Sequence, residues 1–165
     1  MPNQNLQQST PGSYLKLLTV IYSVLFAGQL LFAVLVFMLK NSTNIDFKNT
    51  RDPFLFVVPF MALGAIIGGN FLFKKTLTEA TGKETLKQKL MIYQTAVIIK
   101  SALLEGSSLF GIVVYMRTSN FLYLIISGVL MVYFLAQRPT KDKIENDLNL
   151  SYEDKIQFDS ADTPL

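Results

Sequence analysis

Long apolar segments alternate with short charged segments along the chain. The apolar runs are 17–39, 53–73, 90–116 and 118–137, and only the third contains charged residues. A helix needs about 20 mainly apolar residues to cross the roughly 30 Å hydrocarbon core of a bilayer, and each run is long enough. The pattern therefore predicts an all-α membrane protein whose four transmembrane helices form an antiparallel bundle.

Two polar segments flank this predicted transmembrane domain. Residues 1–16 are rich in Gln, Asn, Ser and Pro, which is typical of a flexible leader. Residues 138–165 form an acidic tail with three lysines against seven Asp or Glu. Within the tail, Ile144 and Leu148 fit a short amphipathic helix. Beyond Tyr152 we expect a disordered, solvated end, with recruitment of a partner as the alternative.

The distribution of cations indicates the orientation of the predicted helices. If the N-terminus is cytoplasmic, nine Lys or Arg near the helix ends lie inside and four lie outside. Cytoplasmic loops of membrane proteins carry the excess of Lys and Arg. We therefore expect a multi-pass protein, in a bacterial inner membrane, with both termini in the cytoplasm.

The third run is unusual because it holds Lys100 and Glu105. Glu105 falls near the membrane midplane, where a charged side chain costs about 2.5 to 3.5 kcal/mol, so it must be neutral, paired, or turned toward protein or water. Helical spacing places Gln94, Ser101 and Ser108 on the same face, whereas Lys100 lies roughly 140° around the helix. This polar stripe is either a hydrogen-bonded packing seam or a site for an ion, a proton or a ligand. We expect Lys100 to extend toward the lysine-rich end of its helix or to meet a partner on another helix.

Other polar and small residues predict contacts between the helices. Gln29 lies in the middle of the first run, where it is a candidate partner for Glu105 or a packing glutamine. Gly64 and Gly68 form a GxxxG pattern in the second run, and Gly69 repeats the spacing one residue on with Ala65. Such small residues let two helix backbones approach closely, either within one chain or between chains.

The start of the third helix has a sequence signature of its own. Thr81-Gly82-Lys83-Glu84 matches a capping box, in which the Thr81 hydroxyl and the Glu84 carboxylate satisfy free backbone amides. The pattern predicts a helix that begins near Gly82.

Composition excludes several kinds of chemistry. The chain has no cysteine and no histidine, which removes thiolate and imidazole metal ligands, thiol nucleophiles and the usual triad bases. We therefore expect no metal, no cofactor and no enzymatic activity, and an enzyme acting on lipid is the weakest alternative. The expected partners are the lipid bilayer and either another protein or further copies of this chain, with no nucleic acid.

Two stretches of the sequence resemble known membrane proteins. Residues 64–69, Gly-Ala-Ile-Ile-Gly-Gly, and residues 102–114, around Glu105, are similar to the helical hairpin of the c subunits, or proteolipids, of rotary ATP synthases. That resemblance covers about a third of the chain and implies that Glu105 carries a proton or sodium ion, with Gly64 and Gly68 at the contact between neighbouring subunits of a ring. Over its whole length the chain looks like small uncharacterised four-helix membrane proteins of bacteria, a resemblance that implies no activity.

Two functional hypotheses follow from these features. The first is an accessory or assembly subunit that joins a larger membrane complex through helix packing. It is motivated by four short spans, close-packing glycines and the absence of a soluble domain. The alternative is proton or ion translocation centred on Glu105 in an oligomer.

Overall fold

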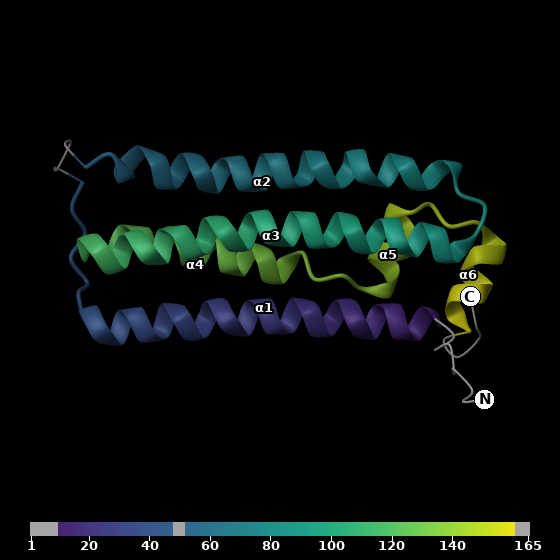
Figure 1. Ribbon diagram of the computed structural model, residues 1–165, viewed down its shortest axis with the longest axis horizontal. Helices are drawn as coiled ribbons and strands as arrows, with labels where there is room; N and C mark the ends of the chain where they lie inside the picture. Colours follow the sequence, from purple (N-terminus) through teal and green to yellow (C-terminus); the bar gives the residue numbers. More distant parts are fainter. Residues whose placement is uncertain (1–9, 48–51, 161–165) are drawn as a thin grey trace, which may run out of the picture.

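The computed structural model describes residues 10–47 and 52–160, and within these ranges all regular secondary structure is helical, without strands. This confirms the predicted all-α class. The helices are α1 (Pro11–Lys40), α2 (Phe54–Thr78), the 3-10 helix η1 (Glu79–Gly82), α3 (Leu86–Thr118), α4 (Phe121–Ala136), α5 (Lys141–Asp147) and α6 (Tyr152–Asp159). Figure 1 shows α1, α2 and α3 side by side with α3 in the middle, and α5 and α6 at the end where α1 begins.

In the part of the chain that the structure describes, three helices are long and apolar enough to cross a membrane: α1, α2 together with η1, and α3. These helices are typical of a multi-pass membrane protein. The predicted span 118–137 is shorter than expected, because α4 has 16 residues and a length of about 24 Å. It becomes a fourth candidate only when taken together with α5, across a bend of 82°. The chain turns there because Pro139 cannot continue the helix.

Helix α3 is the central helix of the chain and packs against α1, α2 and α4. Leu104, Ile112 and Tyr115 on α3 are at most 2% exposed. Gly111 brings α4 close, since a Cβ atom at this position would overlap Ser127 Oγ and lie 3.2 Å from the Tyr123 carbonyl oxygen. The predicted packing role of small residues is therefore met at Gly111, a glycine outside the GxxxG pattern.

The first helix begins earlier than the hydropathy pattern predicts. Thr10 caps α1, because its hydroxyl accepts a hydrogen bond from the Ser13 amide while the Ser13 hydroxyl accepts one from the Thr10 amide. Pro11 occupies the first turn, where a missing N–H costs nothing. The predicted leader 1–16 is therefore wrong for its second part, which is helical, and residues 1–9 lie outside the described ranges.

The predicted start of the third helix is also wrong. Thr81 belongs to η1, and its hydroxyl donates to the Thr78 carbonyl. The N-cap of α3 is Thr85, whose hydroxyl accepts from the Gln88 amide at 3.4 Å. A second threonine four residues downstream provides an equivalent cap, and Leu86, which is 2% exposed, is then buried at the first turn.

The acidic tail folds back onto the helices. Ile144 on α5 is 1% exposed, and Phe158 on α6 is 3% exposed. Lys89 Nζ on α3 lies 2.6 Å from Asp154 Oδ2 on α6. The expectation of disorder beyond Tyr152 is therefore wrong as far as Ser160, because an apolar anchor and an ion pair dock α6; residues 161–165 lie outside the described ranges.

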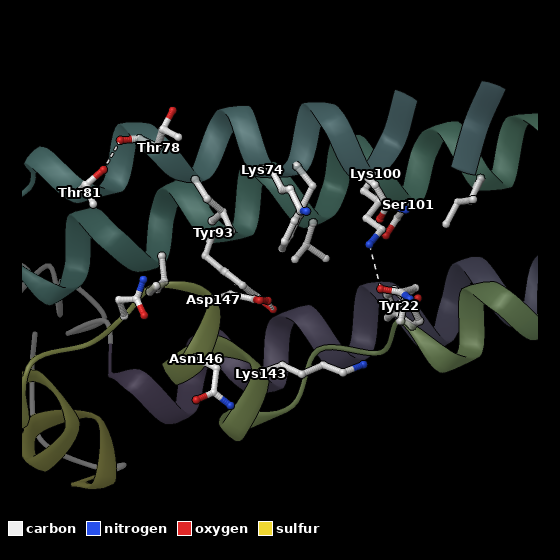
Figure 2. Close-up of a pocket in the computed structure, with 18 residues that line it drawn as sticks. Tyr22, Lys74, Thr78, Thr81, Tyr93, Lys100, Ser101, Lys143, Asn146 and Asp147 are labelled. Carbon is white, nitrogen blue, oxygen red and sulfur yellow. Dashed lines mark hydrogen bonds between the residues drawn. The ribbon is translucent and has the colours of Figure 1, made fainter. Parts of the chain in front are cut away.

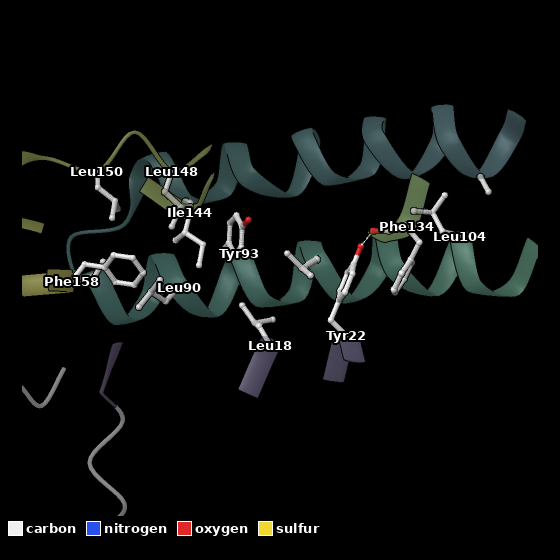
Figure 3. Packing of buried hydrophobic residues seen from close by; sticks show 14 of the residues in the cluster. Leu18, Tyr22, Leu90, Tyr93, Leu104, Phe134, Ile144, Leu148, Leu150 and Phe158 are labelled. Carbon is white, nitrogen blue, oxygen red and sulfur yellow. Dashed lines mark hydrogen bonds between the residues drawn. The ribbon is translucent and has the colours of Figure 1, made fainter. Parts of the chain in front are cut away.

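The larger hydrophobic core joins this tail to the helices. Figure 3 shows Tyr22 of α1 against Phe134 of α4, with Leu90, Tyr93 and Ile144 in the same cluster. The Tyr22 and Phe134 rings stack with centroids 4.0 Å apart, and the Tyr22 hydroxyl donates to the Phe134 carbonyl. The last turn of α4 is thereby held against α1.

Candidate functional site

Glu105 is half-buried in the middle of α3. Within residues 10–47 and 52–160 it has no hydrogen bond and no ion pair with another side chain. It therefore lies at the edge of the packed interior, where it can be reached from outside the protein.

Gln29 does not pair with Glu105, which was one of the two roles that the sequence left open for it. Its side chain is 1% exposed on α1, and neither its amide nitrogen nor its amide oxygen has a hydrogen-bond partner. The ring contacts of Tyr22 with Phe134 and of Phe37 with Phe121 flank Gln29 along α1 and place it near the middle of α4. A buried amide without partners costs about 1 to 3 kcal/mol for each unpaired group, so Gln29 is an expensive residue to keep there.

The predicted polar stripe of α3 divides into two parts. Ser101 and Ser108 are buried, whereas Gln94 and Glu105 are half-buried at the margin. Ser108 forms a seam with Ser127 of α4: each serine hydroxyl donates to the carbonyl of the other, at 3.4 Å from Ser108 and 2.9 Å from Ser127. At Ser108 the stripe is a packing seam.

The Lys100 side chain does not contact Glu105 but bonds to a residue at the end of another helix, which was one of the two arrangements expected. Its Nζ donates to Gln137 Oε1, just after α4, at 2.8 Å and lies 5.0 Å from the centre of the Phe73 ring. The lysine stem lies against Gly69 of α2, since a Cβ atom at Gly69 would be 3.5 Å from Lys100 Cγ. Gly69 thus has the packing role that the sequence suggested.

The other two glycines of the pattern face away from the protein. A Cβ atom at Gly64 or Gly68 would meet no atom of the described chain within 4 Å. Large apolar side chains surround them on the same outward face of α2, namely Phe60, Leu63, Ile67 and Phe71, which are 59–79% exposed. We call this set, with Gly64 and Gly68, the outer α2 face.

A cavity of about 580 Å³ lies between α2, α3 and the segment from Gln137 to Asn149. Its titratable lining residues are Tyr22, Lys74, Tyr93, Lys100, Lys143 and Asp147, and we call it the lysine pocket. Figure 2 shows Asp147 beneath Tyr93, whose hydroxyl donates to Asp147 Oδ2 at 3.4 Å. Of the predicted site residues, Lys100 and Ser101 line this pocket, and Glu105, Gln29, Gln94 and Ser108 do not.

Sequence reasoning missed Lys74, Lys143 and Asp147 as site residues. It counted the two lysines as cations near helix ends and Asp147 as one of the seven acids of the tail. The available signal was the spacing of Lys143 and Asp147, four residues apart and hence on one face of a short helix. Burial raises the pKa of the Asp147 carboxyl, an effect opposed by the Tyr93 hydroxyl and by the nearby charges of Lys100 and Lys143.

The opposite end of the molecule holds a second group of polar residues, the loop cluster: Ser42, Asp46, Asp52, Tyr115, Asn120 and Tyr123. Asn120 Oδ1 accepts from the amides of Asp46 and Leu122 at 3.2 Å, and Asn120 Nδ2 donates to the Asp46 carbonyl at 2.8 Å. Tyr123 Oη donates to Asp52 Oδ2 at 2.6 Å, and Tyr115 Oη donates to the Ser42 carbonyl at 2.8 Å. These bonds tie the loop after α1 to the turn between α3 and α4.

No group of three or more His, Cys, Asp or Glu that could hold a metal ion occurs in the part of the chain that the structure describes. Comparison of the chain with protein-family models, with curated proteins and with solved structures finds no match. Function is therefore inferred from the geometry of the outer α2 face, of Glu105 and of the lysine pocket.

Proposed function

We propose that this protein is an accessory or assembly subunit of a larger membrane complex, which it joins by packing a helix against a partner. In this proposal α4 is the fourth span of an antiparallel bundle in a bacterial inner membrane, with both termini cytoplasmic. The excess of cations on one side of the predicted spans supports this orientation.

The observation that carries the proposal is the outer α2 face. Gly64 and Gly68 are spaced four residues apart on this face, and no atom of the described chain covers them. Phe60 and Ile67 nearby are 79% and 67% exposed, so the two glycines leave a shallow groove next to large apolar side chains. A groove of small residues between apolar ridges is the surface on which a second transmembrane helix can bring its backbone close.

A helix that only faced lipid would gain nothing from this arrangement. Glycine is a poor helix former, by about 1 kcal/mol relative to alanine, and it removes apolar surface from contact with acyl chains. Gly69, by contrast, is used inside the protein, because Lys100 packs on it. A partner helix that packs on Gly64 and Gly68, as Lys100 packs on Gly69, would explain why glycine occupies these two outward positions.

Cysteine cross-linking in native membranes tests the proposal. The chain contains no cysteine, so each introduced thiol is the only one present. Ile67→Cys on the outer α2 face should give a cross-linked adduct, whose mass tells a second copy of this chain from another protein. The control Leu31→Cys, on α1, is 64% exposed and should give little or no adduct.

A second pair of variants tests the groove itself. Gly64→Leu with Gly68→Leu should abolish the Ile67→Cys adduct, while Gly28→Leu, at an equally open glycine of α1, should leave it unchanged. Equal cross-linking from Ile67→Cys and Leu31→Cys, or an adduct that survives the double leucine variant, would contradict the proposal.

Proton or ion translocation through Glu105 is a second candidate function, favoured by one observation. Glu105 is the only acid in the apolar run 90–116, and it has no partner within the described residues. A carboxyl in that state at the membrane midplane is suited to exchange a proton.

Reaction with a carbodiimide and flux into liposomes test this second function. Glu105→Gln should abolish both labelling and flux, and the control Glu84→Gln, at an exposed residue before α3, should change neither. Labelling that persists in the Glu105→Gln protein would remove the candidate.

A further inference from the structure

We propose that the lysine pocket binds a phosphate group, carried either by a lipid headgroup or by a solute. This inference rests on residues at the pocket end of α2, α3 and α5. It does not depend on the outer α2 face or on Glu105.

The pocket has an excess of positive charge that the protein does not neutralise by contact. Lys74, Lys100 and Lys143 line it together with one carboxylate, Asp147. Within the described residues, the ion pairs closer than 4 Å are Lys89 with Asp154, Lys141 with Asp159, and Lys155 with Glu145, so no pocket lysine is paired.

The three lysines are nevertheless not equally free. Lys100 Nζ donates to Gln137 Oε1, and Lys143 Nζ donates to the Ala136 and Arg138 carbonyls at 2.7 and 3.3 Å. Each ammonium group has three donors, so both lysines keep donors for a ligand. Lys74 has no hydrogen bond or ion pair of its side chain within the described ranges.

A hydroxyl in the wall of the pocket also has no hydrogen-bond partner. Ser101 is 4% exposed, lines the cavity, and forms no side-chain hydrogen bond with the described residues. A serine hydroxyl can donate one hydrogen bond and accept others, so Ser101 is available to a group that enters the cavity. Lys100, the preceding residue of α3, lines the same pocket.

The position of the pocket favours phosphate among anions. Lys74 is the first charged residue after the uncharged run 53–73, so the pocket opens where the apolar surface of α2 ends. Lys100 packs on Gly69, about 7.5 Å deeper along α2. Lipid phosphates lie at this boundary, and a tetrahedral phosphate offers several oxygens to separate ammonium groups and a hydroxyl. The cavity volume of about 580 Å³ is that of a small-molecule site.

Binding of two probes to the purified full chain tests the inference and separates the two sources. Inorganic phosphate is titrated in detergent, and lipid retention is measured by native mass spectrometry from nanodiscs of phosphatidylcholine mixed with phosphatidylglycerol. Retention of phosphatidylglycerol over phosphatidylcholine identifies a lipid headgroup. Saturable phosphate binding without lipid preference identifies a solute.

Variants connect either signal to the pocket. Lys74→Gln should weaken binding about fivefold or more, in line with the loss of one lysine at a membrane surface. Lys74 has no partner to lose, so this variant should fold normally. Lys100→Gln and Ser101→Ala should also weaken binding, with folding checked by circular dichroism. The matched control Lys75→Gln removes a neighbouring exposed lysine outside the pocket and should bind like the original chain.

The inference is overturned if neither phosphate nor phosphatidylglycerol binds. It is also overturned if Lys74→Gln and Lys75→Gln weaken binding equally, because the signal would then come from surface charge. These outcomes are independent of the cross-linking results for the outer α2 face.

Discussion

The two ends of this molecule each contain a tyrosine that donates to an aspartate, in very different surroundings. At the loop cluster, Tyr123 is 0% exposed and its hydroxyl lies 2.6 Å from Asp52 Oδ2. At the lysine pocket, Tyr93 is 2% exposed and its hydroxyl lies 3.4 Å from Asp147 Oδ2. The first pair belongs to a hydrogen-bond network beside a smaller cavity of about 380 Å³, whereas the second borders the 580 Å³ cavity, whose three lysines form no ion pair with the described residues.

The difference suggests that the loop cluster stabilises the fold and that the lysine pocket binds a ligand. Polar groups at the loop cluster satisfy one another, which is how buried polar residues stabilise and specify a fold. Polar groups at the lysine pocket are left partly unsatisfied, which costs stability and is typical of a binding site. Substitutions at the two ends should therefore differ in what they damage.

The largest effect is expected at Asn120. Asn120→Ala removes three hydrogen bonds, one that caps α4 at Leu122 and two with the backbone of Asp46, so it should lower the free energy of unfolding by about 2 to 3 kcal/mol. Thermal or denaturant unfolding in detergent, followed by circular dichroism, measures this loss. The control Asn146→Ala changes an exposed residue at the lysine pocket and should cost less than about 0.5 kcal/mol. Equal losses would show that the two ends do not differ.

Replacing each of the two tyrosines by phenylalanine gives a matched comparison, and the expected loss of stability is of intermediate size. Tyr123→Phe removes a short bond to a carboxylate and should cost about 1.5 to 3 kcal/mol. Tyr93→Phe removes a long, weak bond and should cost less than about 0.5 kcal/mol. The same unfolding experiment serves both variants. A larger cost for Tyr93→Phe would mean that the pocket end is the more tightly organised one.

The smallest effect concerns the docking of α6 beside the pocket, and it depends on pH. Burial acts to raise the pKa of Asp154, but hydrogen bonds from Lys89 and Ser151 outweigh it and hold the pKa below the ordinary aspartate value of 3.8. A carboxyl with a lowered pKa stabilises the folded state above its unfolded pKa, and this contribution is lost as the pH falls through the folded value. Docking of α6 should therefore be complete at pH 7 and weaken only below about pH 3.8.

A spin label on Ile156→Cys, at a half-exposed position of α6, reports this docking as a loss of mobility. Asp154→Asn should make the label mobile at pH 7. The control Asp159→Asn, in an exposed pair with Lys141, should leave it ordered, because exposed ion pairs contribute little. If the label is as ordered in the Asp154→Asn protein as in the chain with Asp154, the ion pair does not contribute, and packing of Phe158 alone docks α6.

Much of the fold could be predicted from local pattern. Apolar runs of more than 20 residues predicted α1, α2 and α3. Ser119 makes the turn between α3 and α4 in the left-handed conformation. The start of α1 was misplaced because its first turns, capped by Thr10, are polar and lie outside the apolar run. The start of α3 was misplaced because two nearby threonines, Thr81 and Thr85, could each cap a helix.

The sequence by itself determined the three long helices, their apolar character and the isolation of Glu105 among apolar residues, because these follow from spacing and charge along the chain. Only the tertiary structure decided how the polar residues are paired. Lys100 meets Gln137 rather than Glu105, Gln29 stays unpaired, and Lys74, Lys143 and Asp147 converge on one cavity. Such meetings depend on the rotation of each helix and on the 82° turn after α4, which arise from packing between distant segments.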